Sequence, residues 1–179
     1  EVSKDMIQEL VDEIQKRKEC AAGMFQGEGL FQQSGAAMYI STRDALWVLK
    51  DEELSDPRIL ELFESPAIEK VLFDSRPIAS HLRKKGRFLR GVRMDIVLAE
   101  YIIAAHEKIG DAKTIITKEL SRRTERSEDI IHYAFDIEKK LQKKLSVGKL
   151  LSVLSAIEIP LVPFLTEMEF FGILLASGR

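Results

Sequence analysis

The first third of the chain opens with a helical pattern of apolar positions and continues with strand patterns. Apolar residues recur at helical spacing from Met6 to Ile14, with charged and polar residues between them, which predicts an amphipathic helix over residues 3–18. Ser3 is suited to cap the start of this helix. Three short apolar runs then follow at hairpin-like intervals between glycine-rich or polar stretches. They predict three antiparallel strands over residues 20–25, 36–40 and 45–49.

Helix and strand signals alternate in the middle of the chain. Asp56 followed by Pro57 is typical of a helix start, and the apolar spacing predicts a short helix that ends near Ser65. Residues 71–73 then predict a short buried strand, which meets Asp74.

A second strand and helix pair follows at once. Residues 77–85 have a helical pattern that Gly86 closes, and residues 88–92 predict another short strand. Asp95 is placed to cap a strongly apolar helix. Because a strand followed by a helix is typical of parallel pairing, we expect a parallel or mixed sheet.

Strand signals vanish after Asp111, and the rest of the chain reads as helical. The early strands and late helices predict a single α/β domain, a mixed sheet flanked by helices with a helical C-terminal part, and no boundary before about Ile157. On the last helix, five large apolar residues at near-helical spacing predict exposed apolar surface: Leu161, Phe164, Leu165, Met168 and Phe171. The predicted helices cover residues 112–120, 127–145, 147–157 and 160–171.

The composition is that of an ordinary soluble domain. Hydrophobic residues make up 45% and charged residues 31% of 179 residues, and the longest uncharged stretch, residues 29–42, is too short for a membrane span. We therefore expect no membrane partner. The single cysteine, Cys20, cannot form an intramolecular disulfide and is expected to be an inert core thiol in a reducing, cytoplasmic setting. The chain begins at Glu1 with no apolar leader, which we interpret as an excised piece.

Charge is distributed unevenly along the chain. Residues 1–74 hold 16 acidic and 8 basic side chains, whereas residues 75–149 hold 10 acidic and 18 basic ones. Seven cations occur between Ser75 and Met94 without an acid. They can contact a nucleic-acid backbone, or they can pair with the acidic first third and solvate the surface. The nucleic-acid-binding candidates in this run are Arg83, Lys84, Lys85, Arg87 and Arg90.

Two groups of segments carry a resemblance to a known family. The first contains VLFDS at residues 71–75, LRKKG at 82–86 and LRGV at 89–92, with Asp95 shortly after. The second is IEIPLVPFL at residues 157–165, which Met168-Glu169 and Gly172 follow. In this order the segments resemble the 3′-to-5′ exonuclease domain of bacterial family A DNA polymerases, the polymerase I type, and its junction to the polymerase domain.

The resemblance implies a ribonuclease H-like fold and a place within a DNA polymerase. Residues 1–157 would form the exonuclease-like domain, with residues 1–19 as an N-terminal helix, and residues 158–179 would start the junction to the polymerase domain. The implied partners are that polymerase domain of the same chain and DNA, in replication and repair. The full-length polymerase would use Mg²⁺.

Active exonucleases of this family use two divalent cations held by carboxylates, and the matching motifs here are incomplete. The first motif, Asp-x-Glu, falls on residues 26–28, so Gln26 takes the Asp position and Glu28 is the nearby carboxylate. In the second motif Asp74 remains, while Lys70 stands where active members have an amide.

The third motif also lacks its ligand. A family Tyr precedes the metal-binding Asp by four positions, so Tyr133 would place that Asp at Ile137. A register that uses Asp136 as the downstream acid puts Ala134 at the ligand position. We therefore expect a vestigial, metal-free site with Asp74 as its remnant and no cofactor for this domain. Two alternatives stay open: an active exonuclease with relocated ligands, for example Glu28, Asp74 and Asp136, and a non-enzymatic protein-interaction module.

Overall fold

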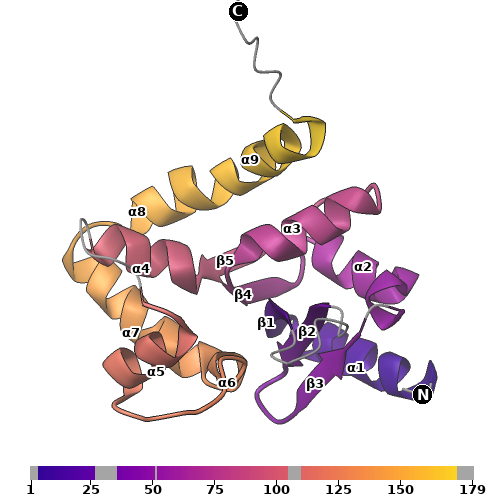
Figure 1. Cartoon of the computed structure of the whole chain (residues 1–179), viewed down its shortest axis with the longest axis horizontal. Coiled ribbons are helices and arrows are strands. Elements are labelled where there is room, and N and C mark those ends of the chain that lie inside the picture. Colours follow the sequence, from indigo (N-terminus) through magenta and orange to yellow (C-terminus); the bar gives the residue numbers. More distant parts are fainter. Residues whose placement is uncertain (1–3, 27–35, 51, 105–109, 173–179) are drawn as a thin grey trace, which may run out of the picture.

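The computed structural model describes residues 4–26, 36–50, 52–104 and 110–172, and Glu28 therefore lies outside the described residues. Five strands form one mixed sheet in the order β3-β2-β1-β4-β5 (Figure 1). The first three strands pair antiparallel, while β1, β4 and β5 are parallel, which confirms the predicted mixed sheet. The strands are β1 (Glu19–Gln26), β2 (Ala36–Ser41), β3 (Leu46–Leu49), β4 (Glu69–Phe73) and β5 (Val92–Asp95).

The two faces of the sheet are covered by different helices. Strand residues alternate between the faces, so Cys20 and Ala22 join one core while Ala21 joins the other. The first core packs against α1 (Lys4–Arg17), α2 (Pro57–Glu64) and α3 (Ser75–Lys84). The second packs against α4 (Ile96–Ala104), α5 (Ala112–Leu120), α6 (Asp129–His132) and α7 (Ala134–Val147).

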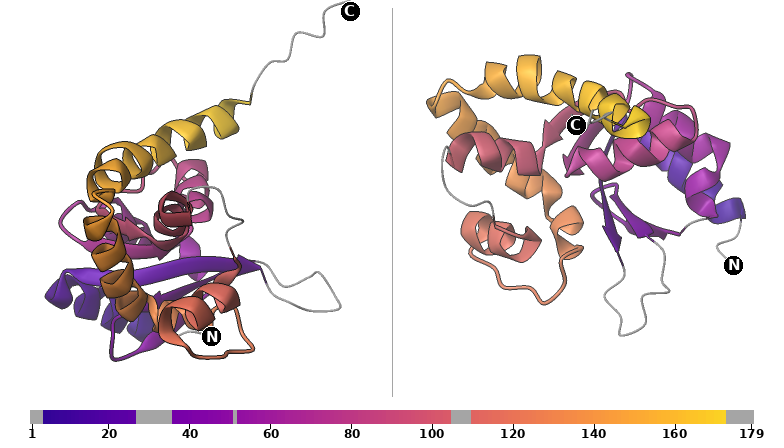
Figure 2. Two further views of the ribbon diagram at one scale, coloured as in Figure 1. Left: turned by 90° about the vertical axis from the view of Figure 1, so that its left-hand side faces the viewer. Right: turned by 45° about the horizontal axis from the view of Figure 1, so that its top comes forward.

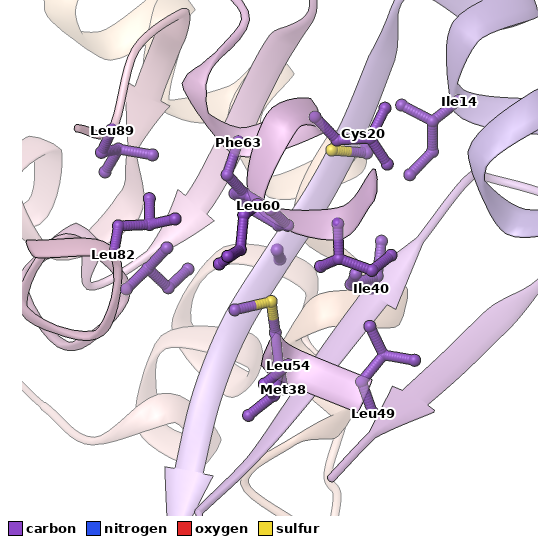
Figure 3. Close-up of a cluster of buried hydrophobic side chains, with 14 of the residues drawn as sticks. Ile14, Cys20, Met38, Ile40, Leu49, Leu54, Leu60, Phe63, Leu82 and Leu89 are labelled. Atoms are coloured by element: carbon purple, nitrogen blue, oxygen red, sulfur yellow. The ribbon is translucent and has the colours of Figure 1, made fainter. Parts of the chain in front are cut away.

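The first core is built from large aliphatic side chains around one aromatic ring. Phe63 of α2 lies at its centre, beside Leu82 of α3 and Ile14 of α1, all of them buried (Figure 3). Each such side chain contributes roughly 1.5–3 kcal/mol to folding through its removal from water. The apolar positions that predicted the helices are therefore the ones that hold them on the sheet.

Local capping signals set two helix starts. Asp56 accepts a hydrogen bond from the backbone N–H of Arg58 at 2.9 Å, and Pro57 occupies the first turn of α2, as predicted. Helix α3 begins at Ser75, two residues earlier than the sequence pattern indicated, because Asp74 caps it through the N–H of Arg76. It ends at Lys84, one residue before the predicted end at Lys85, and Gly86 at φ +73° follows as the predicted stop.

The last strand lies later in the chain than expected. The structure corrects the predicted strand at residues 88–92 to β5, which begins at Val92. Gly91 adopts φ +69°, a conformation that interrupts an extended segment, and its carbonyl accepts a hydrogen bond from the N–H of Lys70. Only beyond this turn does the chain run parallel to β4, while Phe88 is left exposed.

The helical segments of the C-terminal part divide differently from the prediction. A single helix over residues 127–145 is replaced by α6 and α7, which meet at Tyr133, whose φ of −94° and ψ of 1° break the helical path. Conversely, the helices predicted at residues 147–157 and 160–171 form one continuous run. It comprises α8 (Leu151–Val153), a π-helical turn (Leu154–Glu158) and α9 (Ile159–Phe171).

This last helical run lies across one end of the molecule and contacts α3 (Figures 1 and 2). Leu154, Val162 and Thr166 are its buried residues, and the other side of α9 is exposed. Among the described residues, only the segment Leu151–Phe171 is long and apolar enough to cross a membrane, by length and composition alone. The segment contains Glu158, Glu167 and Glu169, so the length of uncharged stretches in the sequence does not indicate it. The five residues predicted to form exposed apolar surface are all exposed: Leu161, Phe164, Leu165, Met168 and Phe171.

Candidate functional site

The carboxyl ends of the parallel strands β1 and β4 meet the start of α3, and this place is called the strand-end site below. Asp74 follows β4 directly and adopts φ +53°. Its carboxylate accepts hydrogen bonds from the backbone N–H and the Nε of Arg76, at 3.3 and 3.2 Å. Asp74 is therefore held as a helix cap and a partner of Arg76.

The pairing of β1 with β4 decides which residue lies beside Asp74. The parallel ladder ends at the pair Gly23 and Phe73, so Met24 is the β1 residue that follows this pair. Gln26 lies two residues farther along, where it pairs with Ala36 of β2. In this register Met24, and not Gln26, is the β1 residue that follows the last pair before Asp74. Neither Met24 nor Gln26 is a carboxylate.

Apolar side chains occupy the sheet surface at the strand-end site. The rings of Phe25 and Phe73 stack with centroids 5.5 Å apart and an angle of 5° between their planes. Tyr39 meets Phe25 edge to face at 5.6 Å. A Cβ atom added to Gly23 would come within 2.7 Å of the Ile131 side chain. The surface between β1, β4 and α6 is therefore closed by packed rings and an isoleucine.

The third-motif residues do not supply a ligand. Ala134 and Ile137 are both buried in the second core. Asp136 is exposed and lies 3.8 Å from Lys139 on the same helix. Tyr133 contacts the ring of His132 at 4.8 Å. Within the described ranges, no three His, Cys, Asp or Glu side chains come together as metal ligands.

Asp95 is a buried carboxylate close to this site, but its oxygens are already used. Oδ1 accepts a hydrogen bond from the N–H of Leu98 at 3.0 Å, which confirms the predicted cap of α4. Oδ2 accepts one from the N–H of Ser75 at 2.7 Å, at the start of α3. Burial raises the pKa of Asp95 despite these hydrogen bonds.

Lys70 of the second motif is a structural residue at the opposite end of β4. Its Nζ is buried and donates to the carbonyl oxygens of Ser65 and Ile68 at 2.7 and 2.8 Å. Burial lowers the pKa of Lys70 to about 8. Its partner in the β1–β4 ladder is Cys20, whose thiol pKa is raised by burial to about 12, so this thiol is inert as predicted.

The donor set at the strand-end site does not fit a pair of Mg²⁺ ions. Two-metal catalysis needs several anionic oxygens that converge on both cations, because Mg²⁺ prefers carboxylate ligands and near-octahedral geometry. Within the described part of the chain, Asp74 pairs with Arg76 and belongs to no cluster of metal-ligating side chains, and the adjoining positions of β1 are Gly23, Met24 and Phe25.

The structure divides the basic run into paired and unpaired cations. Arg83 pairs with Glu167 through two nitrogens, and Arg87 lies 2.7 Å from Glu64. Two further cations of the run, Arg76 and Arg93, also pair with acids. Lys84, Lys85 and Arg90 are exposed and have no ion pair within the described part of the chain.

Sequence reasoning missed the aromatic surroundings of Arg83. Its guanidinium carbon lies 4.2 Å from the ring centroid of Phe170, 5.6 Å from that of Phe171 and 5.7 Å from that of Phe88. The adjacent aromatic pair at residues 170–171 was a visible signal, but its proximity to Arg83 depends on how α9 packs on α3.

Comparison with known proteins agrees with the geometry of the fold. The family model described as "DNA polymerase I, ribonuclease H-like domain" matches residues 26–132. DNA polymerase I of Geobacillus stearothermophilus is 24% identical over 160 residues, which cover 76% of this chain and 18% of the relative. The chain thus spans about a fifth of that relative's length.

Solved structures share the same fold. The POL domain of Pol1 from M. smegmatis, in complex with DNA primer-template and dNTP, superposes with a TM-score of 0.76 at 20% identity, over 92% of this chain and 31% of that chain. NrnC of Brucella melitensis superposes with a TM-score of 0.70 at 14% identity, over 89% of this chain and 88% of that chain. At these identities, the similarity shows the fold alone.

Proposed function

The chain belongs to the family of DNA polymerase I ribonuclease H-like domains, and from this premise we propose that it is a catalytically inactive exonuclease-like domain. The observation that carries the proposal is the strand-end site, where Phe25 stacks on Phe73 and, within the described residues, no cluster of metal-ligating side chains includes Asp74. Hydrolysis by two metals requires several carboxylates that converge on both cations. Apolar packing in their place supports a role without cleavage.

We further propose that the domain is a scaffold for a DNA-directed DNA polymerase domain of the same polypeptide, in DNA replication and repair in the cytoplasm. The exposed apolar side of α9 supports this role, because contiguous apolar surface of this kind marks an interaction site. In this role Mg²⁺ would serve the polymerase domain. The junction would begin near residue 158.

Contact with DNA by this domain is proposed to be weak and independent of sequence. Lys84, Lys85 and Arg90 are the exposed cations that support it, since Arg83 and Arg87 already have carboxylate partners. Such contacts involve the phosphate backbone and weaken steeply with salt.

A nuclease assay tests the proposed inactivity. Purified protein is incubated with 3′-labelled single-stranded DNA and Mg²⁺ or Mn²⁺, beside the Asp74→Ala variant. We expect no release of mononucleotides from either protein. Release that disappears in Asp74→Ala would establish an active exonuclease with relocated ligands, whereas equal release from both would identify a contaminant. Asp12→Ala serves as a matched control, because its carboxylate is exposed on α1 and belongs to none of the three motifs.

A further inference from the structure

The C-terminal ends of α3 and α9 together present cations and aromatic rings on one surface. Three rings surround the Arg83 guanidinium, one from the segment after α3 and two from the end of α9. The α3–α9 surface is defined here as Arg83, Lys84, Lys85, Phe88, Phe170 and Phe171.

The rings of this surface are available to a ligand. Phe88 is 43%, Phe170 49% and Phe171 74% exposed, so Arg83 covers only part of each ring. A hollow of about 220 Å³ lies beside Phe170, and Lys84 lines its wall. Phe170 and Lys84 therefore border the same space.

The unpaired positive charge of this surface lies at the end of α3, on Lys84 and Lys85. Glu167 neutralises Arg83 and holds it against the rings. Lys84 and Lys85 are exposed and without an ion pair in the described ranges, while Glu169 also lines the hollow. Arg83 is thus already paired with Glu167, and the two lysines remain for an anionic partner.

We propose that the α3–α9 surface binds single-stranded nucleic acid, with bases stacked on Phe88 and Phe170 and phosphates beside Lys84 and Lys85. Exposed aromatic rings next to cations are the combination that single strands use, because an unpaired base offers its face for stacking. In a duplex the base faces are stacked on one another, so a duplex can contact only the two lysines. The proposal rests on the proposed DNA contact and is independent of whether the strand-end site cleaves DNA.

The location separates this surface from the strand-end site. Asp74 precedes the first residue of α3, whereas Lys84 is the last, so the length of the helix, about 15 Å, lies between them. Binding at one end can therefore be tested without chemistry at the other.

The test is fluorescence anisotropy of a labelled oligo-dT with the full chain, in EDTA so that neither cleavage nor metal-dependent binding contributes. We expect Phe170→Ala and Phe88→Ala each to weaken binding by about fivefold or more. Phe164→Ala, a change of the same kind at an exposed ring of α9 that is not one of the three rings around Arg83, should leave binding as it is. An increase in salt from 50 to 200 mM should weaken binding by about sevenfold if two phosphates are neutralised.

Further arms identify the ligand class. The double change Lys84→Glu and Lys85→Glu should abolish binding, whereas Lys143→Glu at an exposed lysine of α7 should have little effect. Oligo-rU should compete with oligo-dT, and a blunt duplex should compete weakly. Competition by the duplex as strong as that by oligo-rU would overturn the proposal. A loss of binding in Phe164→Ala equal to that in Phe170→Ala would also overturn it, in favour of a protein-docking surface. Thermal unfolding of each variant confirms that it is folded.

Discussion

The carboxylate of Asp95 joins the starts of two helices, because it accepts the backbone N–H of Ser75 at 2.7 Å as well as that of Leu98 at 3.0 Å. Ser75 begins α3 and Leu98 lies in the first turn of α4. One buried side chain thus satisfies a donor at each helix start and fixes the two helices beside the end of β5.

Replacement of Asp95 by alanine should therefore act on both helices. We expect Asp95→Ala to lower the free energy of unfolding by about 2–4 kcal/mol, since two buried N–H groups lose their acceptor. Asp111→Ala is the matched control, because Asp111 is exposed and caps α5 alone. It should cost about 1 kcal/mol. Urea unfolding at pH 7 measures both values, and equal losses would refute the two-helix role of Asp95.

The ionisation of Asp95 should also give stability a pH dependence. Its folded-state pKa is raised by burial, so above pH 3.8 the folded chain keeps a proton that the unfolded chain has released. The contribution of Asp95 to the free energy of unfolding therefore falls as the pH rises from 3.8 to the raised pKa of the folded state. We expect the stability of Asp95→Asn, which has no such proton, to improve relative to wild type between pH 4 and 7. A constant difference would contradict the shift.

Gly91 and Gly86 form a natural pair for testing backbone crowding. Both adopt positive φ, of +69° and +73°, but a Cβ at Gly91 would overlap the carbonyl oxygen of Ile68, whereas nothing lies within 4 Å of one at Gly86. Gly86→Ala should cost about 1–2 kcal/mol for its left-handed backbone alone. Gly91→Ala should cost at least about 2 kcal/mol more, because the backbone must move. Chemical denaturation of both variants checks the difference.

The buried amine of Lys70 should make the protein more stable at alkaline pH. Burial lowers the pKa of Lys70 from 10.5 to about 8, so between these values the unfolded chain binds a proton that the folded chain has released. Stability should therefore rise with pH relative to Lys70→Met, by about 2 kcal/mol between pH 7.5 and 10. Lys143→Met, at an exposed lysine, should show no such trend against wild type. A flat difference for Lys70→Met would exclude the lowered pKa.

The exposed apolar side of α9 should drive self-association of the separate chain. Phe164 and Met168 are 67% and 53% exposed on one helix, which is unusual for large apolar residues. Sedimentation velocity should show concentration-dependent species that Phe164→Glu reduces. Leu46→Glu removes an exposed leucine of the sheet edge and should have a smaller effect. A strict monomer at high concentration would count against an interaction surface on α9.

Sequence reasoning succeeded where a signal and its partner lie close together in the chain. Asp56 with Pro57 and Asp95 with Leu98 are caps within one helical turn, and the structure confirms both. The bond from Ser75 to Asp95 spans 20 residues and has no local signature, so it was not predicted. The strand expected at residues 88–92 was displaced by the turn at Gly91, whose positive φ depends on its contact with β4.

For the candidate site, the sequence predicted where Asp74 lies but not the register of the strand beside it. Asp74 lies at the end of a strand as expected, yet the neighbouring residue of β1 is set by the β1–β4 ladder, which a sequence does not show. The same limit applies to Arg83. Its partner Glu167 lies 84 residues away, so the sequence left open whether Arg83 faces DNA or an acid.

The packed rings at the strand-end site lead to a last prediction, that added carboxylates will not restore cleavage. Phe25→Glu would add an acid to β1 at the strand-end site, but it would remove the ring that stacks on Phe73 at 5.5 Å and meets Tyr39 edge to face. A half-buried carboxylate without a partner would also lose hydration. We expect Phe25→Glu to lower the free energy of unfolding by about 2–4 kcal/mol and to release no nucleotides with Mn²⁺. Phe25→Leu, which keeps apolar packing, should cost about 1–1.5 kcal/mol. Mn²⁺-dependent cleavage by Phe25→Glu that is lost on further change of Asp74 to alanine would show that only ligands, and not the shape of the site, separate this domain from an active nuclease.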